Sequence, residues 1–320
     1  MIGAIVSIRN AVKPHLDQLE PGDTFIVAVS GGADSLALAH ALLLESQPRA
    51  LNAIAVTVDH QIQENSGAQA SRVSNQLKEM GYVQVFVKKV MVASESNLEA
   101  LARDVRYQAL NEIFQDTKAT KIFLGHTFND QAETVLLGLA RGSGARSLAG
   151  MSEEKDHYIR PLLSISREET ERACRELSLD FWSDPHNFDN EFTRVRVRRE
   201  VIPYLEEKLD PGISRALVRS AALLRDDADA LDSWAEREMA GVDLTDINCE
   251  HLSRLPRAIR TRILRAAALA AGVTPGTLTF EQIGAMDALI SAWSGQGELA
   301  LSGGVKVERI SGRLSLSSKP

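Results

Sequence analysis

Cysteine is almost absent from this chain, whose 320 residues include only Cys174 and Cys249. The two cysteines lie far apart in the sequence, and neither belongs to a C-x-x-C pair. A disulfide framework, a structural zinc site and an iron–sulfur site all depend on several closely spaced cysteines. The cysteine count therefore argues against these three classes of protein.

Long apolar runs are missing as well, so the sequence predicts no membrane-spanning helix. Residues 1–6 are apolar, but they lack a basic leader and an A-x-A cleavage site, and Arg9, Asn10 and Lys13 follow soon after. We therefore expect a cytoplasmic protein. The 44% of hydrophobic and 25% of charged residues are typical of a soluble chain, and a length of 320 residues favours two domains.

The chain also lacks an excess of positive charge, because its formal net charge is −7 and its pI is about 5.6. This charge argues against a protein that coats nucleic acid non-specifically, since such binding depends on many contacts from lysine and arginine to phosphates. A local basic segment that holds one RNA remains compatible with it.

The most informative stretch is a glycine turn, residues 30–35 (SGGADS), between an expected strand and an expected helix. Residues 24–29 form a short apolar, β-branched run, which is typical of a strand buried on both faces. Apolar residues recur at helical spacing over 35–46, so a helix begins near Asp34 or Ser35. Backbone N–H groups at such a helix start favour a bound anion, although glycines also occur at turns simply because they tolerate positive φ.

The turn lacks the lysine of a Walker A loop, and it does not follow the G-x-G-x-x-G spacing of dinucleotide-binding folds. It matches SGGxDS instead, and in this it resembles the pyrophosphate loop (PP-loop) of the N-type ATP pyrophosphatases. The resemblance implies an enzyme that cleaves ATP between its α and β phosphates.

Strands and helices alternate through the first half of the chain. We expect helices within 1–20, over 66–80 and from 96 onward, the last two opened by capping boxes, and further strands over 52–58, 83–90 and 121–125. This alternation predicts an α/β fold with a Rossmann-like parallel sheet. Ligands of such sheets bind beyond the carboxyl ends of the strands, where Asp59, His60 and His126 also lie.

Asp130 and Glu133 are three residues apart at the start of the helix that follows His126. On a helix this spacing places both carboxylates on one face, close enough to hold a metal ion or an ammonium group together. The alternative is that Thr127 or Asn129 caps the helix and that Asp130 only complements its dipole.

Further segments make the resemblance specific to the tRNA(Ile)-lysidine synthase family, among the PP-loop enzymes that modify tRNA. Beside the H-T-x-x-D-Q-x-E-T pattern at 126–134, similar segments stand at 141–151, 159–163, 184–187 and 193–198. The resemblance covers roughly residues 20–210, and this order of motifs is far more selective than any one of them. Two positions depart from the family: Val195 stands where Asn is usual, and Gln63 where Arg is usual.

The resemblance implies that the enzyme adenylates the C2 oxygen of the wobble cytidine in a CAU anticodon and then joins the ε-amino group of free lysine to that carbon. AMP and pyrophosphate leave, and the codon read changes from AUG to AUA. ATP and Mg²⁺ are the implied cofactors, and tRNA(Ile) and L-lysine are the implied partners. Asp34 would hold Mg²⁺, an ion that prefers oxygen ligands. The implied ATP-binding residues are Ser30, Gly31, Gly32, Ala33, Asp34, Ser35, Asp59 and His60.

The resemblance also implies that Asp130 and Glu133 bind the lysine substrate. His126 is the nearest candidate for the base that deprotonates it, although a histidine at a strand end is often only a hydrogen-bonded spacer. Arg106 would face the developing phosphate charge.

Arginines crowd the segment 194–199, and together with Arg141 they are implied to contact tRNA or the adenylate. On an extended chain, alternating arginines would present several guanidiniums on one side, which suits phosphates. The alternative is a solvated surface run before a helix at 200–209. The arginines concerned are Arg194, Arg196, Arg198 and Arg199.

We expect residues 1–213 to form the catalytic domain, 214–240 a helical connector and 241–320 a small α+β domain that binds tRNA. Helices over 256–271 and 279–293 and an antiparallel meander over 298–316 would make up this small domain. Arg257, Arg260, Lys306 and Arg309 are its candidates for tRNA contact, but scattered charges on a small domain more often serve solvation. The chain resembles the short form of the family.

Two other functions stay open at this point. The first is another PP-loop enzyme, although a thiolase of the cytidine type would need clustered cysteines and an amidotransferase would need a cysteine near its N-terminus. The second is a non-catalytic nucleotide-binding or RNA-binding module, which has no need of Asp34, Asp130 and Glu133 together. The sequence does not decide whether the protein forms a homodimer.

Overall fold

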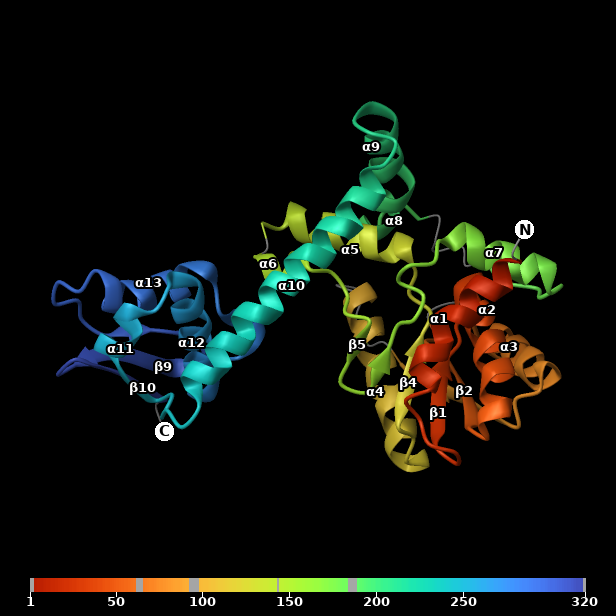
Figure 1. The fold of residues 1–320 in the computed structure, drawn as a ribbon, viewed down its shortest axis with the longest axis horizontal. Coiled ribbons are helices and arrows are strands. Elements are labelled where there is room, and N and C mark those ends of the chain that lie inside the picture. The colour runs from red at the N-terminus through yellow and green to blue at the C-terminus, as the bar shows by residue number, and fades with distance from the viewer. Residues whose placement is uncertain (1–2, 62–65, 92–97, 143, 184–188, 319–320) are drawn as a thin grey trace. The chain divides into compact units, whose positions relative to one another are not determined.

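The computed structural model describes residues 3–318, except for 62–65, 92–97, 143 and 184–188, and except for the side chains of 98–100. The chain divides into two compact units, Met1–Ala222 and Leu223–Pro320, and each is described by itself (Figure 1). Gln63, the expected capping box at Ser96 and the segment 184–187 lie outside the described residues. In the part of the chain that is described, no helix is both long enough and apolar enough to cross a bilayer.

The first unit contains a sheet whose described strands run in the order β3-β2-β1-β4-β6-β5. All neighbouring strands pair in parallel except β5, which pairs antiparallel with β6 at the edge. The expected parallel sheet is therefore confirmed. Strands β5 and β6 were not predicted from the sequence. The strands are β1 (Thr24–Ala28), β2 (Asn52–Asp59), β3 (Gln84–Lys89), β4 (Lys121–Leu124), β5 (Glu154–Lys155) and β6 (Tyr158–Ile159).

Helices cover both faces of this sheet, and the first strand shows why. Phe25 and Val27 of β1 belong to one hydrophobic core, whereas Ile26 belongs to another on the opposite face. A strand buried on both faces has no polar positions to alternate with, which explains its uninterrupted apolar sequence. The first core packs against α1 (Ala4–Leu16), α2 (Ala33–Ser46), α3 (Ser66–Met80) and α7 (Arg167–Glu176), and the second against α4 (Leu98–Thr117).

The strand order reverses between β1 and β4. The chain runs outward from β1 through β2 to β3, and then returns to place β4 on the other side of β1. The carboxyl ends of β1 and β4 therefore lie side by side, and the glycine turn and His126 follow directly after them. Ligands of open parallel sheets bind at such a reversal.

One expectation about the arginine segment is wrong, because residues 194–199 are helical rather than extended, whereas the helix expected at 200–209 is present. Residues 193–208 form α8 (Thr193–Arg196), a π-helical turn η3 (Val197–Val201) and α9 (Ile202–Lys208). The alternation of valine and arginine suggested a strand. In the structure Val195 and Val197 are buried, and the helical turn brings Arg194 and Arg198 to one face, where both meet acidic residues of α5 (Phe128–Ala140).

The second unit combines helices with a sheet in the order β7-β10-β9-β8, all antiparallel. The predicted meander is confirmed as β8 to β10, but the short strand β7 was missed. The predicted helix over 279–293 is confirmed as α13, and a capping box between Thr279 and Gln282 opens it. The elements are α11 (Cys249–Arg254), α12 (Arg257–Ala270), α13 (Phe280–Ser291), β7 (Asp246–Asn248), β8 (Leu299–Ala300), β9 (Val305–Ile310) and β10 (Arg313–Ser318). The long helix α10 (Ile213–Met239) spans the boundary between the units.

Short helical segments complete both units. They are η1 (Gln47–Arg49), α6 (Ala145–Leu148), η4 (Pro275–Thr277) and η5 (Ser302–Gly304).

Candidate active site

The glycine turn needs glycine at one position above all. Gly31 has φ of +88°, and a Cβ added there would lie 2.5 Å from Cγ2 of Val73. Both the backbone conformation and the close neighbour therefore exclude a larger residue. The hydroxyl of Ser35 holds the turn closed, since it donates to the Gly32 carbonyl at 2.9 Å and accepts from the Ser30 N–H at 3.2 Å. Ser35 thus has a structural role here, and its contact with phosphate stays a prediction.

The end of β4 packs directly against the start of α2. A Cβ on Gly125 would lie 3.1 Å from the backbone nitrogen of Ser35, so a larger residue would push the backbone of α2 away by a few tenths of an ångström. Gly32, the N-cap of α2, has no side chain that could satisfy the first N–H groups of the helix. These donors are therefore oriented toward the reversal point of the sheet, where an anion would be stabilised.

Asp34 lies in the first turn of α2, and its carboxylate contacts two residues of α7. Its Oδ1 accepts a hydrogen bond from the hydroxyl of Thr170, and its Oδ2 lies 3.5 Å from Nε of Arg167. Burial raises the pKa of Asp34 to about 6, although Arg167 and the hydrogen bond from Thr170 lower it. This carboxylate therefore changes charge close to neutral pH.

The two carboxylate oxygens of Asp130 have different partners: one binds the start of α5, and the other faces arginines. Its Oδ2 accepts from the backbone N–H of Thr127 at 2.9 Å and from the Thr127 hydroxyl at 3.0 Å, so Thr127 caps α5 as one alternative predicted. Its Oδ1 faces three guanidiniums, with Arg167 at 3.2 Å, Arg194 at 3.3 Å and Arg198 at 3.5 Å. Burial would raise the pKa of Asp130, but Arg167 and Arg194 lower it to about 2.

Glu133 is one turn further along α5 on the same face, as its spacing predicts, and only 1% of its surface is exposed. Its Oε2 accepts from Nε of Arg194 at 2.8 Å and its Oε1 from Nε of Arg198 at 2.6 Å, while Nη1 of Arg167 lies 3.8 Å away. Three carboxylates and three guanidiniums thus form one charge-balanced cluster. We call this cluster the carboxylate–arginine array: Asp34, Asp130, Glu133, Arg167, Arg194 and Arg198.

Two histidines and an arginine lie around the array. Burial lowers the pKa of His126 to about 3. Arg106 lowers this pKa as well, whereas Asp130 raises it, and the imidazole is therefore neutral near pH 7. Its buried Nδ1 has no hydrogen-bond partner. Burial and Arg106 also lower the pKa of His60, and burial lowers the pKa of Arg106. Asp59 is buried at the end of β2, where its Oδ1 accepts from the Gln61 N–H at 3.0 Å.

The other predicted arginines lie outside the array. Arg141 is exposed at the C-cap of α5. Arg196 faces a different direction from Arg194 and Arg198, because its Nη1 donates to the backbone carbonyls of Asn190 at 2.7 Å and Glu191 at 2.9 Å. Arg199 is exposed.

Sequence reasoning missed Arg167 and Thr170, both on α7. A signal was present, because Ser166 and Glu169 form a capping box that places Arg167 at the first helical position. It also missed Arg160, a buried residue of the segment 159–163, whose Nη1 donates to the Ser152 carbonyl at 3.1 Å.

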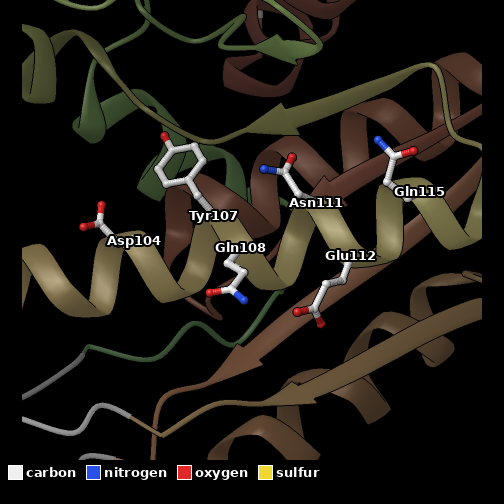
Figure 2. Close-up of a pocket in the computed structure, with 6 residues that line it drawn as sticks. All are labelled: Asp104, Tyr107, Gln108, Asn111, Glu112 and Gln115. Carbon is white, nitrogen blue, oxygen red and sulfur yellow. The ribbon is translucent and has the colours of Figure 1, made fainter. Parts of the chain in front are cut away.

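A shallow hollow along α4 contains none of the predicted site residues (Figure 2). Tyr107 and Asn111 point to one side of the helix in this view, and Glu112 points to the other. Asn111 Oδ1 accepts from the Tyr158 hydroxyl at 2.7 Å, and Glu112 forms an ion pair with Lys88 at 2.7 Å. These contacts tie α4 to its neighbouring strands.

Comparison with known proteins places both units in families. Residues 6–205 match the PP-loop domain, and residues 247–315 match the TilS substrate binding domain. The chain is 45% identical to the tRNA(Ile)-lysidine synthase of Thermobifida fusca, over 98% of each chain. It is 48% identical to that of Streptomyces coelicolor, over 90% of this chain and 84% of the relative, and 44% identical to that of Rhodococcus erythropolis, over 96% and 92%.

A solved structure with a related fold is the U34-tRNA thiolase NcsA from Methanococcus maripaludis with its [4Fe-4S] cluster. It superposes with a TM-score of 0.56 at 22% identity, covering 69% of this chain and 80% of the thiolase. At this identity the likeness concerns the fold alone. Both cysteines of the present chain are buried and free, and Cys174 lies on α7 whereas Cys249 begins α11 in the other unit.

Proposed function

The chain belongs to the tRNA(Ile)-lysidine synthase family, and on this premise we propose that it uses ATP to ligate free lysine to C2 of the wobble cytidine in a tRNA(Ile) with a CAU anticodon. The observation that carries the proposal is the carboxylate–arginine array, in which the carboxylate of the PP-loop and the acidic pair of α5 meet at the reversal point of the sheet. A pure nucleotide-binding module would have no use for three carboxylates at this place.

The phosphates of ATP would lie at the start of α2, against the backbone N–H groups of the glycine turn. Asp34 would hold Mg²⁺, and its donor chemistry fits, because it offers carboxylate oxygens on a side chain that is 21% exposed. Among the described residues, no group of three His, Cys, Asp or Glu is placed to hold a metal ion, which agrees with an ion bound mainly through phosphates and water. Bound there, Mg²⁺ would neutralise charge on the departing pyrophosphate.

Asp130 and Glu133 would receive the ammonium group of lysine. After adenylation of the C2 oxygen, the ε-ammonium group loses one proton to solvent, the resulting neutral ε-amine forms the new nitrogen–carbon bond, the carbon–oxygen bond to AMP breaks, and a second proton leaves the nitrogen. His126 is neutral and therefore able to accept that proton, although a pKa near 3 makes it a weak base. Arg106, Arg194 and Arg198 would stabilise charge on the phosphate of the adenylate.

tRNA binding would involve both units. Arg141 is exposed and Arg196 is half-buried, and we propose that both contact the tRNA backbone. In the second unit, Arg260 and Lys306 are engaged with acidic partners of the same unit. Arg309 donates to the Leu289 carbonyl at 2.9 Å. Arg257, whose side chain is 60% exposed and lies 3.5 Å from Asp287, stays a candidate for the tRNA contact proposed for residues 241–320. A cytoplasmic location and the homodimer stay expectations.

The test is incorporation of radiolabelled lysine into a tRNA transcript with a CAU anticodon, in the presence of ATP and Mg²⁺. The expected result is incorporation that depends on wobble cytidine, with a matched transcript carrying wobble uridine as the control. Asp34→Asn should reduce the rate roughly 100- to 1000-fold, because it removes a charged group that acts directly on the phosphates or their metal ion.

Two outcomes would contradict the proposal in different ways. Equal incorporation by the wild-type protein and by Asp34→Asn would exclude a role for the Asp34 carboxylate in the reaction. Pyrophosphate release that requires some other RNA, without lysine transfer, would support a different tRNA-modifying enzyme of the PP-loop type.

A further inference from the structure

Arg167 contacts all three carboxylates of the array, with a different nitrogen for each. Its Nε lies 3.5 Å from Asp34, its Nη2 lies 3.2 Å from Asp130, and its Nη1 lies 3.8 Å from Glu133. Arg194 and Arg198 each contact Asp130 and Glu133. The planar guanidinium of Arg167 therefore stands between the phosphate side of the site, marked by Asp34, and the acidic pair of α5.

The backbone around Arg167 fixes the position of this side chain. The Arg167 N–H donates to Oδ1 of Asn129 at 2.9 Å, and the Phe128 N–H donates to the Ile165 carbonyl at 2.9 Å, so the starts of α5 and α7 are joined twice. Ser166 caps α7, and the buried Thr170, one turn beyond Arg167, reaches Asp34. Arg167 thus projects from a rigid helix start and not from a loop.

We propose that Arg167 is a positioning residue that holds Asp34, Asp130 and Glu133 in one array and that gives way to the ammonium group of lysine. The proposal rests on the proposed function, because it assumes that the acidic pair receives lysine. Without Arg167, Arg194 and Arg198 would still pair with Asp130 and Glu133, but Asp34 would lose its guanidinium contact and be repelled by Asp130, so the geometry that joins the two sides of the site would be lost. With Arg167 in place, the array is charge-balanced, so an ammonium group can enter only in competition with a guanidinium.

This competition predicts opposite effects on binding and on turnover. Removing Arg167 leaves one carboxylate charge uncompensated, and lysine should bind more tightly because its ammonium group supplies the missing charge. Turnover at saturating lysine should fall, because Asp34 is no longer held at a fixed position relative to Asp130 and Glu133. If Arg167 only stabilised the fold, its removal would lower both the affinity for lysine and the turnover.

The experiment compares Arg167→Met and Arg167→Lys with Arg175→Met, in the full chain. Arg175 lies on the same helix, its side chain is 63% exposed, and it pairs with Glu171 away from the array. Lysine affinity is measured by calorimetry without tRNA, and turnover is measured by lysine incorporation. Circular dichroism and thermal unfolding establish that each variant is folded.

For Arg167→Met we expect lysine to bind roughly fivefold more tightly and saturated turnover to fall roughly 10- to 100-fold, in the range seen when a group that orients a site is removed. Arg167→Lys should bind lysine as the wild type does, with intermediate turnover, because one point charge cannot face three carboxylates at once. Arg175→Met should match the wild type in both.

Weaker lysine binding in Arg167→Met, or unchanged turnover in a folded Arg167→Met, would overturn the proposal. If Arg167→Met does not fold, Arg167→Lys decides alone, and wild-type turnover in that variant would overturn it. The proposed function fails separately, through an absence of lysine incorporation by the unmodified protein.

Discussion

Each unit of the protein contains buried arginine–carboxylate contacts, but the two arrangements differ in kind. In the second unit, Nε and Nη2 of Arg260 contact the two oxygens of Asp287 at 2.5 and 3.3 Å, and Nη1 donates to the Leu255 carbonyl at 3.0 Å. Both side chains are less than 10% exposed. In the array of the first unit, by contrast, one oxygen of Asp130 is shared among three guanidiniums at 3.2 to 3.5 Å.

The difference shows how the same chemical groups serve structure in one place and exchange in another. The pair of Arg260 and Asp287 is bidentate and closed, so a ligand would have to break several short hydrogen bonds to enter. The arginines of the array are 20 to 25% exposed and share Oδ1 of Asp130 at 3.2 to 3.5 Å, although Arg194 and Arg198 also hold Glu133 at 2.8 and 2.6 Å. On the proposed function, a phosphate or an ammonium group would therefore replace one partner of Asp130 without leaving another charge buried and unpaired.

The largest effect on stability is expected from breaking the closed pair. Arg260→Met leaves Asp287 buried without its main partner, and the free energy of unfolding should fall by about 3–5 kcal/mol. The measurement is denaturant unfolding of the full chain, followed by a probe in the second unit, such as Trp293 fluorescence. The double variant Arg260→Met/Asp287→Leu is the control, since it removes both charges and should recover most of the loss. Equal instability of the single and the double variant would argue that the charge is not the cause.

Replacing Asp34 of the array by Asn should raise the free energy of unfolding, by less than the Arg260→Met substitution lowers it. The folded protein holds the pKa of Asp34 at about 6, above the ordinary value of 3.8, so ionising this residue opposes folding. The free-energy cost of ionising Asp34 in the folded protein is absent below about pH 4, where the residue is protonated in both states. It grows as the pH rises toward 6 and is complete above that pH. Asp34→Asn should therefore be more stable than the wild type by up to about 3 kcal/mol at pH 8, and equally stable near pH 4, since a tenfold change in acidity corresponds to about 1.4 kcal/mol.

The pH series is measured on both proteins, and only their difference is interpreted. His126 and Asp130 also titrate differently in the folded and unfolded states, but their contributions cancel in this difference if the substitution leaves them unchanged. A difference that does not vary between pH 4 and 8 would contradict the raised pKa of Asp34.

The smallest expected changes in the free energy of unfolding come from comparing an arginine inside the array with one beside it. Arg198→Met removes contacts to Glu133 at 2.6 and 3.1 Å, and the free energy of unfolding should fall by about 2 kcal/mol because a buried charge loses charged hydrogen bonds. Arg196→Met, two residues away, loses exposed bonds to two backbone carbonyls and to the Thr193 hydroxyl, and should change the free energy of unfolding by about 0.5 kcal/mol. Both are measured by urea unfolding, and equal losses would mean that the array contributes nothing beyond ordinary hydrogen bonding.

Much of the fold could be predicted because its signals are local. The apolar run of β1, the helical spacing in α2 and the capping box of α13 each lie within a few consecutive residues. The short strands β5, β6 and β7 were missed, because two or three residues carry no periodicity and become strands only through their partners. The arginine segment was predicted extended for a related reason, since its alternation of valine and arginine fits a strand until α5 supplies acidic residues one helical turn apart.

The sequence alone determined the glycine turn after β1, the helical spacing of the acidic pair after β4 and the order of motifs that marks the family, and it predicted that the chemistry lies there. It determined these because backbone conformation and spacing along a helix are properties of neighbouring residues. Only the tertiary structure decided which cations face the three carboxylates. Arg167 is 133 residues from Asp34 in the chain, and no local pattern records that the reversal of strand order brings α2, α5 and α7 together around one guanidinium.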